Sequence, residues 1–568
     1  MRLFHPLRWL RAAKRIVRRG RAAAPIAPSR RRVVLLQIDG LSSRRLLQAL
    51  ARGDMPHLAR WLDSGQARLA CLHAASPPST PVFTAGLLYG ARDGVPGFGW
   101  YDRALGRQVR MDLAEDVSAV EAGLAADRRP LLDGGTSYGT IWPGGADDAF
   151  FNVVLFNYGA TSTGKLVRNA YDKLVSTAAG AVIAGRVASR FALELGVGLW
   201  DFVRWCRRIH STRFEWRFLY MRLFVSVVMR DVSTQAAVVD ILRGVPRIFI
   251  DYLGYDEYAH RRGPDSELAL YNLAGTDAAI AKIFRAVRAV PEYNYDVFVF
   301  SDHGQLATIP FERVVGRELR ELVLEHARVA VGGSLSSHDV RELVSLRATE
   351  FWTRTLPKGL RGPARLYVEW LRRRVRRRAD DDTWRPLDAI EVVTGGSIAN
   401  IYFDRGAPTR LTLEELDARY PELVDALERC PAVGLMVARG AGGPIVMYRG
   451  GRWRLGDRRA LERLEPFRRL GFELAATHLL HAAEGERYGD LVLYGAFAAA
   501  GDVSFDFEFG SHGGIAPEEL DQFVLHPAHI ALPPELRDGA AVVAEQFYRF
   551  FAGRYGDRDE APASEDAA

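Results

Sequence analysis

Three short strand-like segments, at residues 33–38, 247–251 and 296–301, each lead to residues that can bind a metal ion. Short apolar runs of this kind are typical of strands that are buried on both faces of a parallel sheet. Between the first two, segment 46–62 has apolar residues at helical spacing. Strands that alternate with helices predict an α/β layered domain, in which ligands gather at the carboxyl ends of the strands.

The residues after these segments include three carboxylates and three imidazoles. They are Asp39 after the first segment, Asp256 and His260 after the second, Asp302 and His303 after the third, and His512 in a glycine-rich turn. An Asp and a His four residues apart lie on one side of a helical turn. Each residue alone has an ordinary explanation as a turn, cap or loop residue. As an ordered set they predict a site for zinc or a similar divalent ion, with three ligands per metal and an open position for substrate.

The order of these blocks resembles the alkaline phosphatase superfamily, and within it the type I phosphodiesterase/nucleotide pyrophosphatase branch. The blocks are Asp39-Gly40, Ser79-Thr80, 256–264, 301–304 and 510–513, and Met55-Pro56-His57-Leu58 is similar to a further family segment. The resemblance covers about residues 33–310 and 485–530. It implies a three-layer α/β/α core with a central, mostly parallel sheet, to which helical and α+β insertions are added.

The resemblance also implies two metal ions, zinc first and manganese as the alternative. One would be held by Asp256, His260 and His512, and the other by Asp39, Asp302 and His303, with Thr80 as a further ligand of the second ion. The family pattern makes Thr80 the nucleophile of a reaction that passes through a phosphothreonine intermediate.

The choice of Thr80 depends on how one glycine is matched to the family. If Gly90 corresponds to the glycine of the family's Thr-Gly-Leu-Tyr-Pro block, the spacing selects Thr80; if Gly86 does, it selects Ser76. Ser79 is a further alternative. The segment after Ser76 lacks the arginine that the sulfatase branch requires, so sulfatase activity is not expected.

The surroundings of the nucleophile favour a diester substrate. Between Thr80 and Asp102 there is no asparagine, although the phosphodiesterase branch has one there that contacts a phosphate oxygen. We expect Phe98, Trp100 and Tyr101 to form part of the substrate site, because apolar side chains suit the second organic substituent of a diester.

We therefore predict a metal-dependent phosphoester hydrolase, in first place a phosphodiesterase. Its substrate would be a small-molecule or lipid-linked phosphoester. The nearest alternatives are a phosphomonoesterase or a phosphoryl or phosphoethanolamine transferase on the same core. A rival from another class is a binding protein with a vestigial site, which the complete set of ligand types disfavours.

The basic charge of the chain is concentrated at its beginning. There are 76 Lys and Arg residues against 69 Asp and Glu, but residues 1–32 hold eleven of the basic ones and no acid, so the rest is slightly acidic. Because nucleic-acid binding requires a basic face on the folded part, we expect none. The three cysteines, Cys71, Cys206 and Cys430, are too few and too far apart for a disulfide framework.

Composition divides the chain into five segments. We predict a basic leader at 1–32, a catalytic core at 33–319 with a helical insertion at about 160–240, and an inserted accessory domain at 320–485. The chain would return to the core at 486–555, starting with a strand at 490–494, and end in a disordered tail at 556–568.

The sequence leaves open whether the protein contacts a membrane. The leader is either a solvated segment or an amphipathic helix on an anionic membrane surface. Segment 178–199 is apolar but contains three charged residues, which excludes a simple spanning helix. Segment 200–229 alternates aromatic residues with arginines, and we favour core packing there over a membrane-facing insertion. No export signal is visible, so we expect a cytoplasmic protein, either free or peripheral at the inner membrane face.

Overall fold

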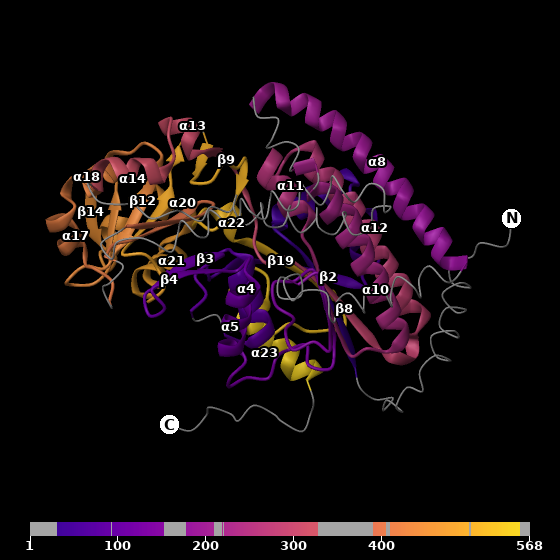
Figure 1. The fold of residues 1–568 in the computed structure, drawn as a ribbon. Coiled ribbons are helices and arrows are strands. Elements are labelled where there is room, and N and C mark those ends of the chain that lie inside the picture. The colour runs from indigo at the N-terminus through magenta and orange to yellow at the C-terminus, as the bar shows by residue number, and fades with distance from the viewer. Residues whose placement is uncertain are drawn as a thin grey trace, which may run out of the picture.

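The computed structural model describes residues 31–91, 94–152, 178–209, 218–219, 221–327, 390–404, 409–498 and 501–556 (Figure 1). The predicted leader, the tail after residue 556 and most of the segment 320–390 lie outside these ranges. Within them the chain forms one eight-stranded sheet, one six-stranded sheet and two small sheets.

The eight-stranded sheet is the centre of the predicted catalytic core. Its strand order is β20-β2-β19-β8-β1-β7-β5-β6. The strands are β1 (Arg32–Ile38), β2 (Ala67–Ala74), β5 (Thr136–Tyr138), β6 (Asp148–Phe150), β7 (Arg247–Tyr252), β8 (Tyr295–Phe300), β19 (Asp521–Pro527) and β20 (Ala541–Val542). All of them run in one direction except β19, which is antiparallel to β8 and β2. The three predicted strands are β1, β7 and β8, and they are direct neighbours.

Helices cover both faces of this sheet, as Figure 1 shows. One face packs against α2 (Ser43–Arg52), α3 (Pro56–Asp63), α10 (Arg230–Arg243), α11 (Gly254–Arg262) and α12 (Glu267–Ala289), and the other against α4 (Thr80–Tyr89), α5 (Ala114–Leu124) and α23 (Ala544–Tyr555). Because β1 is buried on both sides, Val34 and Leu36 enter the first core while Val33 and Leu35 enter the second. The predicted three-layer α/β/α architecture is therefore confirmed.

The six-stranded sheet forms the accessory part and is antiparallel throughout. It contains, in order, β10 (Glu391–Gly395), β11 (Ile398–Tyr402), β15 (Leu491–Gly495), β12 (Val433–Ala438), β13 (Ile445–Tyr448) and β14 (Gly451–Arg454). Its helices are α14 (Leu319–Ala327), α17 (Leu413–Arg419) and α18 (Pro421–Arg429) on one face and α19 (Arg458–Leu461), α20 (Glu465–Leu470) and α21 (Phe472–Glu484) on the other.

One strand of this sheet differs from the sequence prediction. We expected the strand near 490–494 to return to the catalytic core, but β15 pairs with β11 and β12 in the middle of the accessory sheet. A uniformly apolar strand fits any buried position, so its composition did not identify its partners. The chain rejoins the central sheet only at β19.

Short elements connect the two parts. A four-stranded sheet contains β16 (Phe497–Ala498), β17 (Gly501–Ser504), β9 (Leu306–Pro310) and β18 (Gly510–Ser511), and a hairpin is formed by β3 (Gly99–Asp102) and β4 (Arg107–Arg110). The remaining helices are α8 (Ala178–Ile209), the π-helix η1 (Phe224–Met229), α13 (Phe311–Val315), α22 (Pro517–Leu520), η2 (Pro291–Tyr293) and η4 (Pro534–Leu536). Of the helices in the described residues, none is long and apolar enough to cross a membrane.

Candidate active site

The predicted ligands meet at one edge of the central sheet. Asp39 directly follows β1, Asp302 and His303 lie just beyond β8, and α11, which begins two residues after β7, carries Asp256 and His260 one turn apart. Because β1 lies between β7 and β8 and all three strands are parallel, these five residues share the carboxyl edge. His512 joins them from the end of β18, and Thr80 from the first residue of α4. All seven side chains are buried.

The first compact group contains Asp39, Asp302 and His303, whose ligand atoms all lie within 4.8 Å of one another. Nε2 of His303 is 3.3 Å from Oδ2 of Asp302 and 3.5 Å from Oδ1 of Asp39. The hydroxyl of Thr80 lies 3.5 Å from the same Asp39 oxygen and 3.3 Å from the same histidine nitrogen. Two carboxylates, an imidazole and a hydroxyl thus face one small volume.

The second compact group contains Asp256, His303 and His512. It differs from the predicted set in that His303 takes the place of His260. Nε2 of His260 is 3.1 Å from Asp256 Oδ2, and Nε2 of His512 is 3.9 Å from Asp256 Oδ1. The rings of His303 and His512 are stacked, with their centroids 3.9 Å apart. The two groups therefore adjoin each other, and His303 lies between them.

The three imidazoles are held in the same way. Nδ1 of His303 contacts the Gly304 carbonyl at 3.0 Å, and Nδ1 of His512 contacts the Pro78 carbonyl at 2.7 Å. Nδ1 of His260 contacts Gly510 O at 2.8 Å and Glu508 Oε2 at 2.9 Å. A carbonyl oxygen can only accept, so Nδ1 must donate, and in a neutral ring Nε2 then keeps its lone pair. Each ring thus presents Nε2 to the carboxylates, which is the arrangement typical of metal-bound histidines.

Two supporting features could not be recognised in the sequence. Glu508 is buried and orients His260, but it stands in an ordinary acidic segment with no motif of its own. Gly40 has a φ of +70°, and a Cβ there would lie 2.6 Å from Asp256 Oδ1. The turn after β1 therefore requires glycine both for its backbone conformation and for the approach of α11.

The buried carboxylates repel one another. Burial, followed by the charges of Asp302 and Asp256, raises the pKa of Asp39 well above its usual value. Burial and the charge of Asp256 raise the pKa of Asp302 to about 6. Burial would also raise the pKa of Asp256, but its interactions with the imidazoles of His260, His512 and His303 lower it overall. Oδ2 of Asp302 is buried and has no hydrogen-bond partner among the described residues. This donor set fits divalent cations, which would offset the repulsion.

Two of the imidazoles, those of His303 and His512, are in the form that metal binding requires. Burial lowers the pKa of His303 to about 4. Burial and the neighbouring His303 lower the pKa of His512 to about 3. Both rings are therefore neutral at neutral pH, and their Nε2 atoms can act as ligands.

We expect this depressed pKa to make the metal-free protein less stable in acid. Below pH 6.5 the unfolded chain protonates His512, while the folded chain keeps it neutral, so stability falls as the pH falls. His512→Gln should remove about 2 kcal/mol of the loss between pH 6.5 and 5. Urea unfolding at both pH values in the presence of a chelator measures this, with the exposed His73→Gln as the matched control. An unchanged pH dependence in His512→Gln would contradict the assigned environment.

The three predicted substrate residues lie in different places. Phe98 is partly exposed, and its ring centroid is 6.5 Å from that of His512. Trp100 and Tyr101 are fully buried in the core below the β3–β4 hairpin. The structure thus brings Phe98 to the ligand groups and leaves the other two in the core, because the strand β3 packs there.

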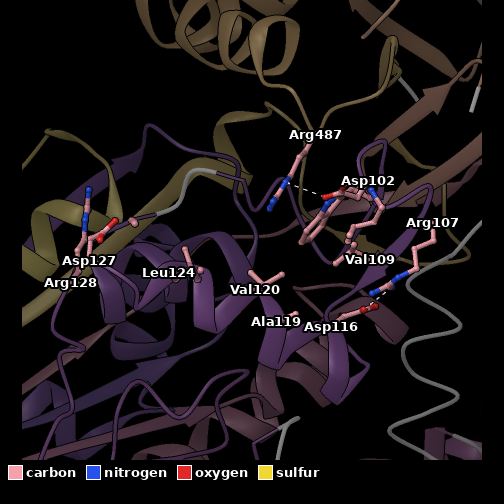
Figure 2. Close-up of a pocket in the computed structure, with 14 residues that line it drawn as sticks. Asp102, Arg107, Val109, Asp116, Ala119, Val120, Leu124, Asp127, Arg128 and Arg487 are labelled. Atoms are coloured by element: carbon pink, nitrogen blue, oxygen red, sulfur yellow. Dashed lines mark hydrogen bonds and ion pairs between the residues drawn. The ribbon is translucent and has the colours of Figure 1, made fainter. Parts of the chain in front are cut away.

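A separate cavity of about 440 Å³ lies beside this hairpin and α5. Figure 2 shows the ion pairs along its wall, Arg487 with Asp102 at 3.5 Å and Arg107 with Asp116 at 2.7 Å. Trp100 also lines it, whereas none of the seven clustered side chains does. The cavity is therefore distinct from the ligand groups.

The comparison with protein families agrees with the geometry. The family model for type I phosphodiesterase / nucleotide pyrophosphatase matches residues 33–431. Phosphonoacetate hydrolase from Sinorhizobium meliloti 1021 has a similar solved structure, with 13% identity, a TM-score of 0.42, and coverage of 93% of this chain and 96% of that chain. Murine ectonucleotide pyrophosphatase / phosphodiesterase 5 has 12% identity, a TM-score of 0.42, and coverage of 92% and 95%. No curated protein sequence matches.

The family match extends over well more than half of the chain and includes five of the six predicted acid and imidazole ligands. The chain therefore belongs to the type I phosphodiesterase/nucleotide pyrophosphatase family and is a metal-dependent phosphoester hydrolase.

Proposed function

We propose that this hydrolase is a phosphodiesterase that uses two divalent metal ions and the hydroxyl of Thr80 as nucleophile. The observation that supports this most directly is the position of Thr80 Oγ1, 3.5 Å from Asp39 and 3.3 Å from His303. A threonine hydroxyl is barely ionised at neutral pH and needs activation by its surroundings. Its contact with the ligand group favours Thr80 over Ser76 and Ser79.

The proposed ligands divide into two sets. One ion would be held by Asp39, Asp302, His303 and Thr80, and the other by Asp256, His260 and His512. His260 Nε2 already contacts Asp256 at 3.1 Å, which supports its place in the second set. Mixed nitrogen and carboxylate donors favour zinc, with manganese as the alternative. When bound, the ions would supply Lewis-acid stabilisation of the attacking and leaving oxygens.

The reaction would proceed in two displacements at phosphorus. In the first, the Thr80 hydroxyl gives its proton to the Asp39 carboxylate, which lies at hydrogen-bond distance from it. Thr80 Oγ1 forms a bond to phosphorus while the bond to the leaving oxygen breaks, and the electron pair goes to the leaving group. In the second, a water oxygen attacks the phosphothreonine, the bond to Oγ1 breaks, and one proton of the water passes to Thr80. Asp39 releases the proton that it took in the first step to the solvent. The product is a phosphate monoester.

The environment of Phe98 supports a diester as substrate. The aromatic ring of Phe98 lies near His512, with the ring centroids 6.5 Å apart. A monoester brings two charges to the site and usually requires an additional cation. An apolar ring instead suits the second organic substituent of a diester.

We expect Phe98→Asn to reduce the preference for diesters. The ratio of kcat/KM for bis-p-nitrophenyl phosphate to that for p-nitrophenyl phosphate should fall by about tenfold, because one apolar contact is worth about 1–3 kcal/mol. Leu105→Asn, which changes an exposed residue of the same hairpin, is the matched control. A wild-type enzyme that prefers the monoester, or a ratio that Phe98→Asn leaves unchanged, would contradict this assignment.

Two rivals have their own tests. A transferase on the same core would pass the phosphoryl or phosphoethanolamine group to an alcohol, so a mass-labelled acceptor would gain the group faster than water does. A vestigial binding protein would contain less than half an equivalent of metal after purification. The complete set of ligand types at the sheet edge supports an enzyme over the vestigial binding protein.

A further inference from the structure

Helix α8 presents a stripe of apolar side chains to solvent, and these side chains do not pack in the core. Leu193, Leu199, Trp200 and Val203 are 65%, 42%, 60% and 54% exposed. We call these four residues the outer stripe. Leu193, Trp200 and Val203 follow each other at seven and three positions, on one face of the helix. Leu199 lies at the edge of that face, next to Trp200 and four positions before Val203. Twelve large hydrophobic residues are exposed in the described part of the chain, and four of them fall within these eleven positions of α8.

The acidic residues of this part of α8 face the interior of the protein. Glu194 is buried and lies 2.9 Å from Arg222, and Asp201 is buried and lies 2.6 Å from Arg262. Between residues 191 and 205 the exposed charged residue is Arg204, whose guanidinium lies 5.3 Å over the Trp200 ring. The exposed face is thus apolar, aromatic and basic, with no exposed acid in that range.

The place of α8 in the fold leaves this face open. Figure 1 shows α8 as the outermost helix beside α11 and α12, with its length along the surface. Its inner side packs closely, since a Cβ at Gly198 would lie 2.3 Å from Leu219. The outer stripe is therefore exposed to solvent, while the opposite side of α8 packs against the rest of the protein.

We propose that the outer stripe docks this enzyme on an anionic lipid surface and that its substrate is a phosphodiester presented by that surface. An amphipathic helix with Trp, Leu and Arg on its exposed side is typical of interfacial binding. Arginine is attracted to anionic headgroups, and the inward position of the acids removes repulsion. Four side chains are few for a protein partner, which uses roughly 20–30 residues a side.

Helix α8 also contacts residues that lie next to the ligand groups. Arg262, two residues after His260 on α11, pairs with Asp201 and stacks over Trp205 at 4.4 Å. Trp205 also contacts Phe509, with ring centroids 5.6 Å apart, and the Phe509 amide donates to the His260 carbonyl at 2.8 Å. A lipid surface bound to the outer face of α8 would therefore be connected, through α8, to the residues that position His260. This proposal rests on the phosphodiesterase function and adds where the substrate is presented.

The test is co-sedimentation of the full-length protein with vesicles of phosphatidylcholine containing phosphatidylglycerol. The stripe variant Leu193→Ser/Trp200→Ser/Val203→Ser should bind at least about tenfold more weakly than wild type. The control variant Leu47→Ser/Leu105→Ser/Leu324→Ser changes three residues outside α8 that are about half exposed, and it should bind within twofold of wild type. Both should hydrolyse the soluble bis-p-nitrophenyl phosphate at the wild-type rate, so loss of docking is distinguishable from loss of catalysis.

A second measurement separates α8 from the basic leader. Brominated phosphatidylglycerol should quench the tryptophan fluorescence of the bound protein, and Trp200→Phe should remove much of that quenching. Equal vesicle binding by wild type and the stripe variant overturns the proposal, as does quenching that Trp200→Phe leaves unchanged. A stripe variant that alters the size-exclusion elution but not vesicle binding assigns the face to a second copy and also overturns it.

Discussion

Replacing Thr80 by alanine should lower kcat for bis-p-nitrophenyl phosphate by about 10⁴-fold, because the oxygen that bonds to phosphorus is removed. Thr80 Oγ1 is the hydroxyl in contact with Asp39 and His303. The measurement is steady-state hydrolysis with the metal content of each variant determined in parallel. Metal content should change little, since six other ligands remain.

Three control variants identify the nucleophile. Thr80→Ser keeps a hydroxyl at the same place and should retain activity within about tenfold of wild type. Ser76→Ala and Ser79→Ala, which remove the other two buried hydroxyls of this segment, should each stay near the wild-type rate. If Ser76→Ala or Ser79→Ala is the inactive variant instead, the glycine match that selects Thr80 is wrong.

Removal of the metal ions should lower activity by at least about 10³-fold. The buried Asp39 and Asp302 carboxylates then face each other without a counter-charge, and Thr80 loses the Lewis acid that would stabilise its alkoxide. The measurement is activity after exhaustive dialysis against a chelator, followed by titration with zinc or manganese. Activity should return at two equivalents of metal.

A single-site variant sharpens this expectation. Asp302→Asn removes one ligand charge and should leave the purified protein with about one bound ion and very low activity. Asp63→Asn, which changes an exposed aspartate, is the matched control and should keep both. Full activity of the chelated wild-type protein, or full metal content in Asp302→Asn, would contradict the proposed centre.

The central strands and their ligands could be predicted because two independent signals coincide there. The segments that became β1, β7 and β8 are buried on both faces, so their apolar composition is continuous. The residues at their carboxyl ends must converge in any parallel arrangement of neighbouring strands. Local composition therefore sufficed to place Asp39, Asp256 and Asp302 at one edge.

Other features depend on contacts that composition does not encode. The strand β15 is as apolar as β1, and only its partners β11 and β12 decide that it belongs to the accessory sheet. Trp100 lies in the core because β3 pairs with β4. Glu508 acts through His260, 248 positions away in the sequence. The sequence also could not decide whether segment 200–229 packs in the core or faces a membrane. Phe218 lies in the core, as we favoured, whereas Trp200 is exposed.

Anomalous diffraction from crystals soaked in zinc tests the two-metal centre most directly. The account predicts two strong peaks at the carboxyl edge of the central sheet. One should lie among Asp39, Asp302, His303 and the Thr80 hydroxyl, and the other among Asp256, His260 and His512. A single peak, or peaks that leave these side chains without a bound ion, would contradict it.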